Sequence, residues 1–300
     1  MDQLFTQDVT VENILPASAG QELIDWGLNA IMAQQAWKKT KGEGVKVAIL
    51  DTGVDTTHPD LQGNIKAAMD FTGSPYGVVD KKGHGTHVAG IIAGVDNGIG
   101  MIGVAPHAEL YIAKVLGDNG SGSFEAIVRG IDWAIAQGVD LINMSLGSSE
   151  EPPAAMHEAV KRAHEAGIFL VAATGNENRS VGWPAMYDEV VAVSAMDLTY
   201  ERATFSNYGM KNEVMAPGVE IYSTYPTGQY AELSGTSMAT PVIAGAIALY
   251  LSLLKKQGIV RPPVEQVHQA VVKAVVDLGS NGKDDLYGAG LINLVKLLGK

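Results

Sequence analysis

Hydrophobic residues along this chain fall into two patterns, short continuous runs and longer stretches in which they recur every three or four positions. Residues 45–50 form a continuous, largely β-branched run that follows a glycine-rich turn and ends at Asp51. A run of this kind is typical of a strand buried on both faces, as in a parallel sheet. Similar runs at 110–116, 139–144, 168–173 and 190–193 are separated by helical patterns such as 125–137 and 154–166.

This alternation of strands and helices predicts an α/β fold with a mainly parallel, doubly wound sheet flanked by helices. With 300 residues, 46% of them hydrophobic, the chain can bury the core of one large domain. No internal repeat or low-complexity linker interrupts it, so we expect a single domain over residues 21–300 with an N-terminal extension over residues 1–20. The shorter, glycine-rich segments 214–216, 220–224 and 230–233 predict hairpins and loops.

Three polar residues stand where such a fold gathers its chemistry. Asp51 ends the first strand, and His84 and Ser237 each open a stretch with the pattern of a buried helix. Catalytic groups collect at the carboxyl edge of a parallel sheet, and a helix N-terminus adds the positive end of a dipole there. A serine hydroxyl becomes a nucleophile when an imidazole takes its proton, and a carboxylate fixes the tautomer of that imidazole. These residues together predict nucleophilic catalysis.

Five segments give the chain a close resemblance to the subtilisin-like serine peptidases. They are VAILDTGVD at 47–55, HGTHVAG at 84–90, NMSLG at 143–147, ATGNE at 173–177 and SGTSMATP at 234–241. The order Asp, His, Ser along the chain is also that of subtilisin, whereas the α/β-hydrolases run Ser, Asp, His. The resemblance covers the chain from Trp26 to the C-terminus.

The resemblance implies a serine endopeptidase in which Ser237 attacks the peptide carbonyl, His84 acts as general base and then acid, and Asp51 orients His84. Asn176 would donate its side-chain amide to the oxyanion, beside the backbone N–H of Ser237. His87, the second histidine of its motif, is expected to be structural. An esterase or lipase of the α/β-hydrolase type would carry Gly-x-Ser-x-Gly, which the sequence lacks around its serine. The other alternative is a non-catalytic binding or scaffold protein that retains the fold.

Two segments resemble the strands between which the family holds an extended peptide substrate. The resemblance also implies a pocket for the P1 side chain, with Glu177 at its mouth, and a P4 contact made by Phe124 and Leu146. We expect broad cleavage after large apolar residues, and Glu177 would also admit Lys or Arg. For Phe124 the alternative is plain core packing. The strand residues are Gly120, Ser121 and Gly122 with Ser145, Leu146 and Gly147, and the P1 pocket adds Ala173 and Gly182 to Gly147.

A short loop after the His84 helix resembles the calcium-binding loop of the family. The resemblance implies that it wraps a Ca2+ ion with backbone carbonyls and one asparagine side chain, joined by the carboxylate of Asp60. Hard oxygen ligands of this kind suit calcium. A remaining ligand would come from the N-terminal segment, where Glu22 is the candidate. The loop ligands are Val95, Asn97, Ile99 and Met101.

Patterns for two other cofactors are incomplete. Residues 98–103 fit Gly-x-Gly-x-x-Gly, but they follow a helix rather than a strand, so we discount a dinucleotide. His84 and His87 lie three positions apart, yet the chain has neither a His-Glu-x-x-His motif nor a cysteine to complete a zinc site.

Residues 1–20 are far shorter than the folding-assisting prodomain of the secreted relatives and resemble the extension of the intracellular branch of the family. In that branch the extension crosses the active site and keeps the enzyme silent. Its Leu-Ile-Pro-aromatic motif is matched in part by Ile14-Leu15-Pro16-Ala17. Pro16 would stiffen the segment and keep a scissile bond out of register with Ser237. The alternative is a tail that only packs on the surface.

The net charge and the N-terminal sequence limit which partners and which compartment we expect for this protein. A net charge of −12 argues against nucleic acid, because phosphate binding needs a cationic surface, and it is compatible with protein and peptide substrates. Residues 1–8 have neither the basic region nor the apolar core of a signal peptide. The long apolar stretch 238–254 belongs to the catalytic core, so no membrane segment is expected. We therefore expect a cytoplasmic enzyme, and the sequence gives no indication of its oligomeric state.

Overall fold

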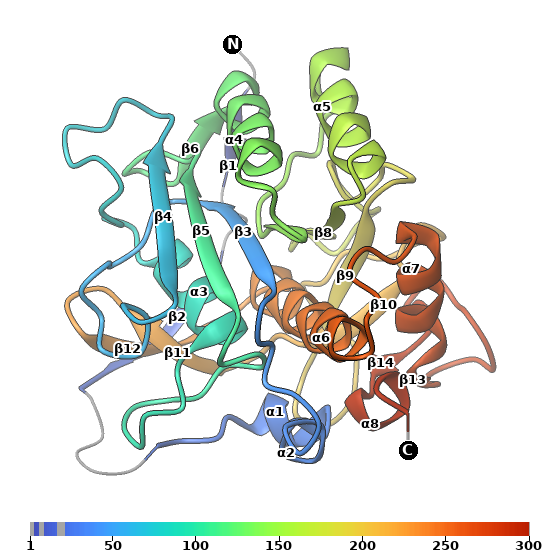
Figure 1. The fold of residues 1–300 in the computed structure, drawn as a ribbon. Coiled ribbons are helices and arrows are strands. Elements are labelled where there is room, and N and C mark those ends of the chain that lie inside the picture. Colours follow the sequence, from blue (N-terminus) through green and yellow to red (C-terminus); the bar gives the residue numbers. More distant parts are fainter. Residues whose placement is uncertain (1–2, 6–8, 17–21, 300) are drawn as a thin grey trace.

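The computed structural model describes residues 3–5, 9–16 and 22–299 (Figure 1). Within the expected extension, residues 1–2, 6–8 and 17–20 therefore lie outside the described residues. The described chain forms one large sheet with helices on both faces, and two smaller sheets lie beside it (Figure 1). This arrangement confirms the predicted α/β fold.

Nine strands form the large sheet, and neighbouring strands are parallel except for β13, which is antiparallel to β14. The five predicted runs become β3, β5, β7, β8 and β9. The prediction of a hairpin or loop at 214–216 is wrong, because β10 pairs in parallel with β9 inside this sheet. In order across the sheet, the strands are β13 (Val275–Val276), β14 (Leu291–Ile292), β10 (Val214–Pro217), β9 (Val191–Met196), β8 (Phe169–Ala173), β7 (Leu141–Met144), β3 (Lys46–Asp51), β5 (Glu109–Lys114) and β4 (Ile65–Asp70).

Central strand β3 shows why a continuous apolar run is needed here. Val47 and Ile49 point to one face of the sheet and join one hydrophobic cluster, while Ala48 and Leu50 point to the other face and join a second cluster. Helices α4 and α5 contribute to the second cluster, and α3 and α6 contribute to the first. The helices are α1 (Trp26–Ala30), α2 (Ala33–Ala36), α3 (His84–Ala93), α4 (Phe124–Gln137), α5 (Ala154–Glu165), α6 (Thr236–Lys256), α7 (Val264–Lys273) and α8 (Leu294–Leu297).

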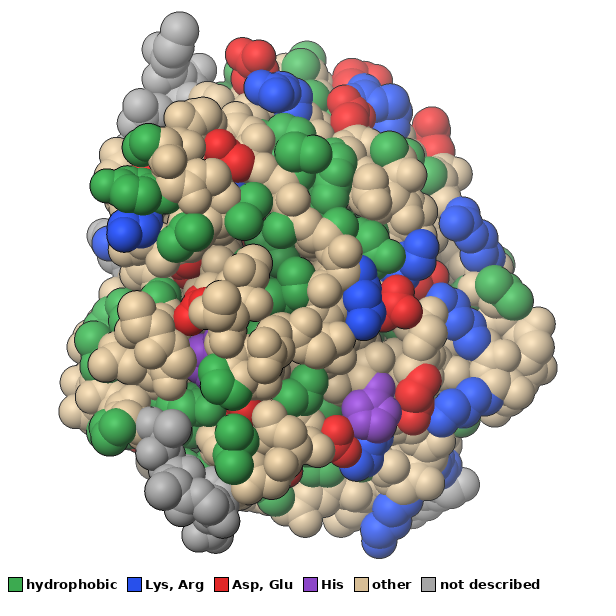
Figure 2. All heavy atoms as spheres, turned by 60° about the vertical axis from the view of Figure 1, so that its left-hand side comes forward, with side chains coloured by type: hydrophobic (Ala, Val, Ile, Leu, Met, Phe, Trp, Pro, Cys, Tyr) green, Lys and Arg blue, Asp and Glu red, His purple; other side chains and the backbone are tan. Residues whose placement is uncertain are grey.

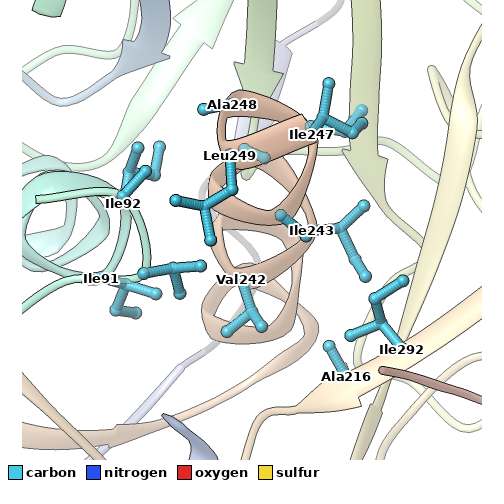
Figure 3. Packing of buried hydrophobic residues seen from close by; sticks show 14 of the residues in the cluster. Ile91, Ile92, Ala216, Val242, Ile243, Ile247, Ala248, Leu249 and Ile292 are labelled. Atoms are coloured by element: carbon cyan, nitrogen blue, oxygen red, sulfur yellow. The ribbon is translucent and has the colours of Figure 1, made fainter. Parts of the chain in front are cut away.

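The longest helix, α6, lies inside the first cluster. Figure 3 shows Val242 and Leu249 on the side that faces Ile91 and Ile92 of α3, and Ile243 on the side that faces the sheet. Among the described helices, α6 is the one long and apolar enough to cross a membrane, and 89% of its most apolar window is buried inside the protein. Its hydrophobicity is therefore accounted for by packing in the core, as expected from the sequence.

Two small sheets hold the N-terminal extension against the rest of the protein. Strands β11 (Ile221–Tyr225) and β12 (Gln229–Ser234) form the hairpin predicted from their glycine-rich segments, and β2 (Thr10–Leu15) adds to β12 as an antiparallel third strand. Strand β1 (Gln3–Phe5) pairs antiparallel with β6 (Ser121–Ser123). The described parts of the extension are thus strands rather than a loose tail.

Candidate active site

Asp51 and His84 meet at the carboxyl edge of the large sheet. Asp51 is the last residue of β3 and His84 the first of α3, and both side chains are buried. The Nδ1 atom of His84 donates a hydrogen bond of 2.7 Å to Oδ1 of Asp51. With the proton fixed on Nδ1, the neutral ring presents Nε2 as a base. Nε2 is buried and has no hydrogen-bond partner among the described residues, so it is available to accept a proton.

The turn before α3 is built so that the helix can start against the Asp51 loop. Gly83 has a positive φ of 91°, and a Cβ there would lie 2.3 Å from the ring of Tyr225. A Cβ on Gly85 would lie 2.2 Å from the carbonyl oxygen of Gly53 and 3.2 Å from Oδ1 of Asp51. Only a residue without a side chain fits at these positions, which explains the two glycines that flank His84.

A second buried carboxylate, Asp80, organises the same turn. Its Oδ1 accepts hydrogen bonds from Gly83 N and from the hydroxyl of Thr52, and its Oδ2 accepts from the backbone N–H and hydroxyl of Thr86. These bonds satisfy the free N–H groups at the start of α3 and place negative charge at the positive end of the helix dipole. Sequence analysis missed Asp80, because it lies in a loop with no strand or helix pattern.

Ser237 lies in the first turn of α6, the helix that packs against α3. Its hydroxyl donates to the carbonyl of Ser145 at 3.2 Å, and the described contacts do not join it to His84. Catalytic hydrogen bonds are often loose without substrate and tighten in the complex. The structure therefore brings Asp51 and His84 together and leaves Ser237 on the neighbouring helix start, bonded to Ser145.

The sequence also explains how the carbonyl of Ser237 is satisfied. Pro241 occupies the position four residues later and has no N–H to donate to it. The hydroxyl of Ser145 donates to this carbonyl instead, at 2.9 Å, and itself accepts from the side-chain amide of Asn143 at 3.0 Å. The NMSLG segment thereby fixes the start of α6.

Asn176 lies beside the start of α6. Its Oδ1 accepts hydrogen bonds from both the backbone N–H and the hydroxyl of Thr236, each at 2.8 Å. These two bonds set the orientation of the amide plane, and Nδ2 lies 3.3 Å from where a Cβ on Gly235 would be. The amide nitrogen thus lies beside the turn that leads into Ser237.

A small pocket opens next to this site and brings together three of the predicted P1 residues, Gly147, Glu177 and Gly182. The fourth, Ala173, is fully buried and does not line it. Arg179 also lines the pocket, and its Nε lies 3.8 Å from Oε2 of Glu177.

Asn207 holds the wall of this pocket, and sequence analysis missed it. The side chain is almost completely buried, and its Oδ1 accepts from the backbone N–H groups of Glu177 and Arg179. Its Nδ2 donates to Oε2 of Glu177 at 2.7 Å and to the carbonyl of Thr174 at 3.0 Å. No sequence pattern indicates the contact, because some thirty residues separate Asn207 from the loop that it supports.

Strand β6 contains two of the predicted substrate-binding residues, Ser121 and Gly122, and it is already paired. In the register of β1 with β6, Leu4 lies opposite Gly122 and Phe5 opposite Ser121. Phe124 and Leu146, which we expected at P4, are buried in the second hydrophobic cluster. For Phe124 this agrees with the alternative of plain core packing. Gly120 precedes β6 with a φ of +85°.

The extension also lies next to the turn that leads into Ser237, but a different residue from the expected Pro16 makes the contact. A Cβ on Gly235 would lie 2.9 Å from Cγ1 of Val9, so Val9 covers the turn that leads into Ser237. The expectation that Pro16 acts on a bond at Ser237 is wrong. Because β2 is antiparallel to β12, Thr10 lies opposite Ser234 while Leu15 lies opposite Tyr230, at the end of β12 away from Ser237.

The predicted calcium loop folds around Asp60, whose side chain is fully buried. Oδ1 of Asp60 accepts from the amide of Asn97 at 2.8 Å, and Oδ2 accepts from Met101 N and from the hydroxyl of Tyr230 at 3.0 and 2.8 Å. The N-terminal candidate Glu22 accepts from the backbone of the same loop at Gly98. The structure thus folds the loop onto one buried carboxylate, an oxygen ligand of the kind that suits Ca2+, and N–H and O–H donors make the contacts of that carboxylate.

His87 lies one turn after His84 but takes no part in this chemistry. It is fully buried, and its Nε2 donates to the carbonyls of Ile221 and Ala231, each at 3.0 Å. Burial lowers the pKa of His87 to about 3, so its ring stays neutral. Over the described residues, no three His, Cys, Asp or Glu side chains lie together as a metal-binding group.

Comparison with known proteins places this site in context. Residues 42–290 match the Subtilase family. The chain is 45% identical over 272 residues to Subtilisin Savinase of Lederbergia lenta, which covers 90% of this chain and 97% of that protein. It is 44% identical over 279 residues to Subtilisin DY of Bacillus licheniformis, covering 91% and 98% of the two chains. An intracellular serine protease of Paenibacillus polymyxa is 43% identical over 281 residues, covering 89% and 84%.

Proposed function

The chain belongs to the subtilase family and is a subtilisin-like serine endopeptidase, and from this premise we propose that Asp51, His84 and Ser237 are its catalytic triad. Ser237 attacks the peptide carbonyl, His84 takes the proton of the hydroxyl and returns it to the leaving amine, and Asp51 holds the imidazole. The observation that carries this assignment is the buried 2.7 Å hydrogen bond from His84 to Asp51. It leaves Nε2 as the atom able to exchange a proton.

Asn176 stabilises the oxyanion, together with the backbone N–H of Ser237. Support comes from the two hydrogen bonds of Thr236, which orient the amide beside the start of α6 before any substrate binds. A donor that is already oriented costs no reorganisation when negative charge develops on the carbonyl oxygen.

The substrates are proteins and peptides held as extended strands, and the P1 side chain enters the pocket between Gly147 and Gly182. A neutral, large P1 residue is preferred. The carboxylate of Glu177 already accepts from Asn207 and lies close to Arg179, so it attracts a P1 Lys or Arg less than an isolated carboxylate would.

The extension, residues 1–20, keeps the peptidase domain, residues 21–300, latent. Support comes from β1 on the predicted substrate strand β6, Val9 against Gly235, and β2 on the strand that leads into Ser237. An extended substrate needs β6 and cannot use it while β1 is paired there. In such a latent enzyme, displacement or cleavage of the extension is the activating event.

Asp60, Asn97 and the carbonyls of Val95, Ile99 and Met101 hold a calcium ion that stabilises the fold. Support comes from the buried carboxylate of Asp60 and from the side chain of Asn97 beside it. In the structure the amide nitrogen of Asn97 faces Asp60, so its oxygen must turn inward when the cation binds. A rise in the unfolding temperature with Ca2+, abolished by Asp60→Asn, tests the site without reference to activity.

We also propose that the enzyme acts in the cytoplasm, with neither nucleic acid nor a membrane as a partner. One relative is named as an intracellular protease, and the net charge of −12 disfavours a polyanion. Immunolocalisation or cell fractionation tests this placement. A broad peptidase in that compartment needs the latency described above, so the two proposals support each other.

The test compares two forms of the same folded protein: the full chain, and the full chain cut after folding at a protease site inserted behind Gly20. Each is given casein and an anilide peptide with a large apolar P1 residue, with calcium and with a chelator, and Ser237→Ala is the control. We expect hydrolysis by the cut form and little by the intact one. If both forms fold and neither hydrolyses either substrate, the non-catalytic binding protein is the correct interpretation.

A further inference from the structure

Strand β12 has one edge that only the extension covers in the described part of the chain. Its other edge pairs with β11, and the order of the small sheet is β11, β12, β2. The strand ends at Ser234, three positions before Ser237, so this edge leads directly to the nucleophile. When β2 leaves, the edge presents unpaired N–H and C=O groups, which is a template for another strand.

The extension shows in which direction a chain runs over this surface. Residues 3–5 lie antiparallel on β6, Val9 lies against Gly235, and residues 10–15 lie antiparallel on β12. A peptide that follows the same direction has the part before its scissile bond on β6 and the part after it on β12. The two strand pairings therefore lie on either side of the contact between Val9 and Gly235.

One side-chain contact on this edge can provide selectivity. Asn13 lies opposite Glu232, and its Nδ2 donates to Oε2 of Glu232 at 2.7 Å. Val11 and Ile14 are 46% and 51% exposed, so their side chains add little. Figure 2 turns this side of the molecule forward, where acidic side chains reach the surface among hydrophobic ones.

The charge of Glu232 is not neutralised within the described structure. Neither a lysine nor an arginine forms an ion pair with it there. Burial raises the pKa of Asp25 to about 6, and repulsion from the negative charge of Glu232 adds to this effect. The neutral amide of Asn13 gives Glu232 a hydrogen bond but no charge, whereas a cationic side chain opposite Glu232 would supply both.

We propose that the free edge of β12 is a binding site for the segment of a peptide substrate that follows the scissile bond, and that Glu232 makes it select a lysine or arginine at the position held by Asn13. This inference rests on the proposed latency, because the edge is available only after β2 has left. The ligand is an extended peptide that adds as a third strand, with one basic side chain facing Glu232.

The test uses the extension's own sequence, for which the register is known. A fluorescent peptide with the sequence of residues 9–16 is titrated against the Ser237→Ala chain, folded intact, cut behind Gly20 and freed of its extension by gel filtration. Two further peptides carry the substitutions Asn13→Lys and Asn13→Ala, and their affinities are compared by anisotropy. The enzyme variants are Glu232→Gln and, as a control carboxylate in the turn before β11, Glu220→Gln.

We expect the peptide with Asn13→Lys to bind about three- to fivefold more tightly than the peptide with Asn13→Ala, the range of a partly exposed ion pair. Glu232→Gln should remove this difference and Glu220→Gln should keep it. Equal affinities for the two peptides, a difference that survives in Glu232→Gln, or no binding at millimolar peptide would overturn the proposal. Because binding is measured without Ser237, a failure of the catalytic proposal appears separately, as absent hydrolysis by the cut chain that retains Ser237.

Discussion

Replacing Gly85 with alanine should disable the proposed triad without changing any of its three residues. Gly85 is the second residue of α3, and a Cβ there would lie 2.2 Å from the carbonyl oxygen of Gly53, in the loop that follows Asp51. An ordinary contact needs 3.4 Å, so the helix start that carries His84 must move from the Asp51 loop by about 1 Å. The hydrogen bond between His84 and Asp51 cannot keep its length through that shift.

The expected cost follows from this distance. A displacement of about 1 Å at a reacting group lowers the rate roughly 100-fold, which corresponds to about 2.7 kcal/mol of activation free energy. Overpacking should cost about 1–3 kcal/mol of folding stability, which a protein of this size tolerates. The assay is kcat on an apolar-P1 anilide peptide with the cut chain, normalised to folded protein and accompanied by a thermal melt.

Gly63→Ala provides the matched control. A Cβ there meets nothing nearer than Val95 Cγ1 at 3.9 Å, and Gly63 is not among the residues with positive φ. We expect its kcat to remain at the wild-type value. If Gly85→Ala folded and kept kcat within threefold of wild type, the argument that close contact at Gly85 sets the catalytic geometry would be refuted.

Four further changes test separate parts of the account. Asn176→Ala should lower kcat by roughly 10²–10³ with KM little changed, a magnitude taken from the corresponding experiment on a subtilisin; an unchanged kcat would exclude the oxyanion role. Ile243→Ala, fully buried in α6, should cost about 2–5 kcal/mol in urea unfolding while activity per folded molecule is kept. The hydrogen bond of His268 to Glu213, 3.1 Å long, raises the pKa of His268 and contributes to lowering that of Glu213. The lowered pKa of Glu213 stabilises the fold above the pKa that Glu213 has in the unfolded chain, and this stability is lost on acidification. The raised pKa of His268 stabilises the fold below the pKa that His268 has in the unfolded chain, and this stability is lost as the pH rises. His268→Gln should therefore lower the urea midpoint at about pH 6, and lower it much less at about pH 9. Arg179→Gln should raise the preference for P1 lysine over leucine about threefold in paired anilide assays, because its guanidinium partly neutralises the neighbouring carboxylate; an unchanged ratio would contradict that reasoning.

The large sheet could be predicted from sequence because each of its main strands is a continuous apolar run. Its strands β3, β5, β7, β8 and β9 are buried on both faces, and such burial leaves a pattern that needs no knowledge of the neighbours. Strand β10 is only four residues long, so its run is too short to distinguish a parallel strand from a loop. Strand β4 at the sheet edge was not predicted, because its partly exposed residues break the apolar run.

The meeting of Asp51 and His84 was predictable for a related reason. One ends a parallel strand and the other begins a helix, and both positions lead to the same edge of the sheet. Asp80 and Asn207 act through hydrogen bonds to residues distant in sequence, and a polar loop residue carries no mark of such a partner. The predicted position of Pro16 was wrong for the same reason, because the register of β2 on β12 is set by pairing between residues more than 200 positions apart.

The central claim is that Ser237 is an active nucleophile which the extension covers. The most direct measurement is the rate at which a fluorophosphonate probe labels the protein, with the modified residue identified by mass spectrometry, for the intact chain and for the chain cut behind Gly20. The account predicts labelling at Ser237 alone, fast after the cut, slow before it and lost in His84→Ala. Equal rates for the intact and cut forms, or no labelling of Ser237 in either, would contradict it.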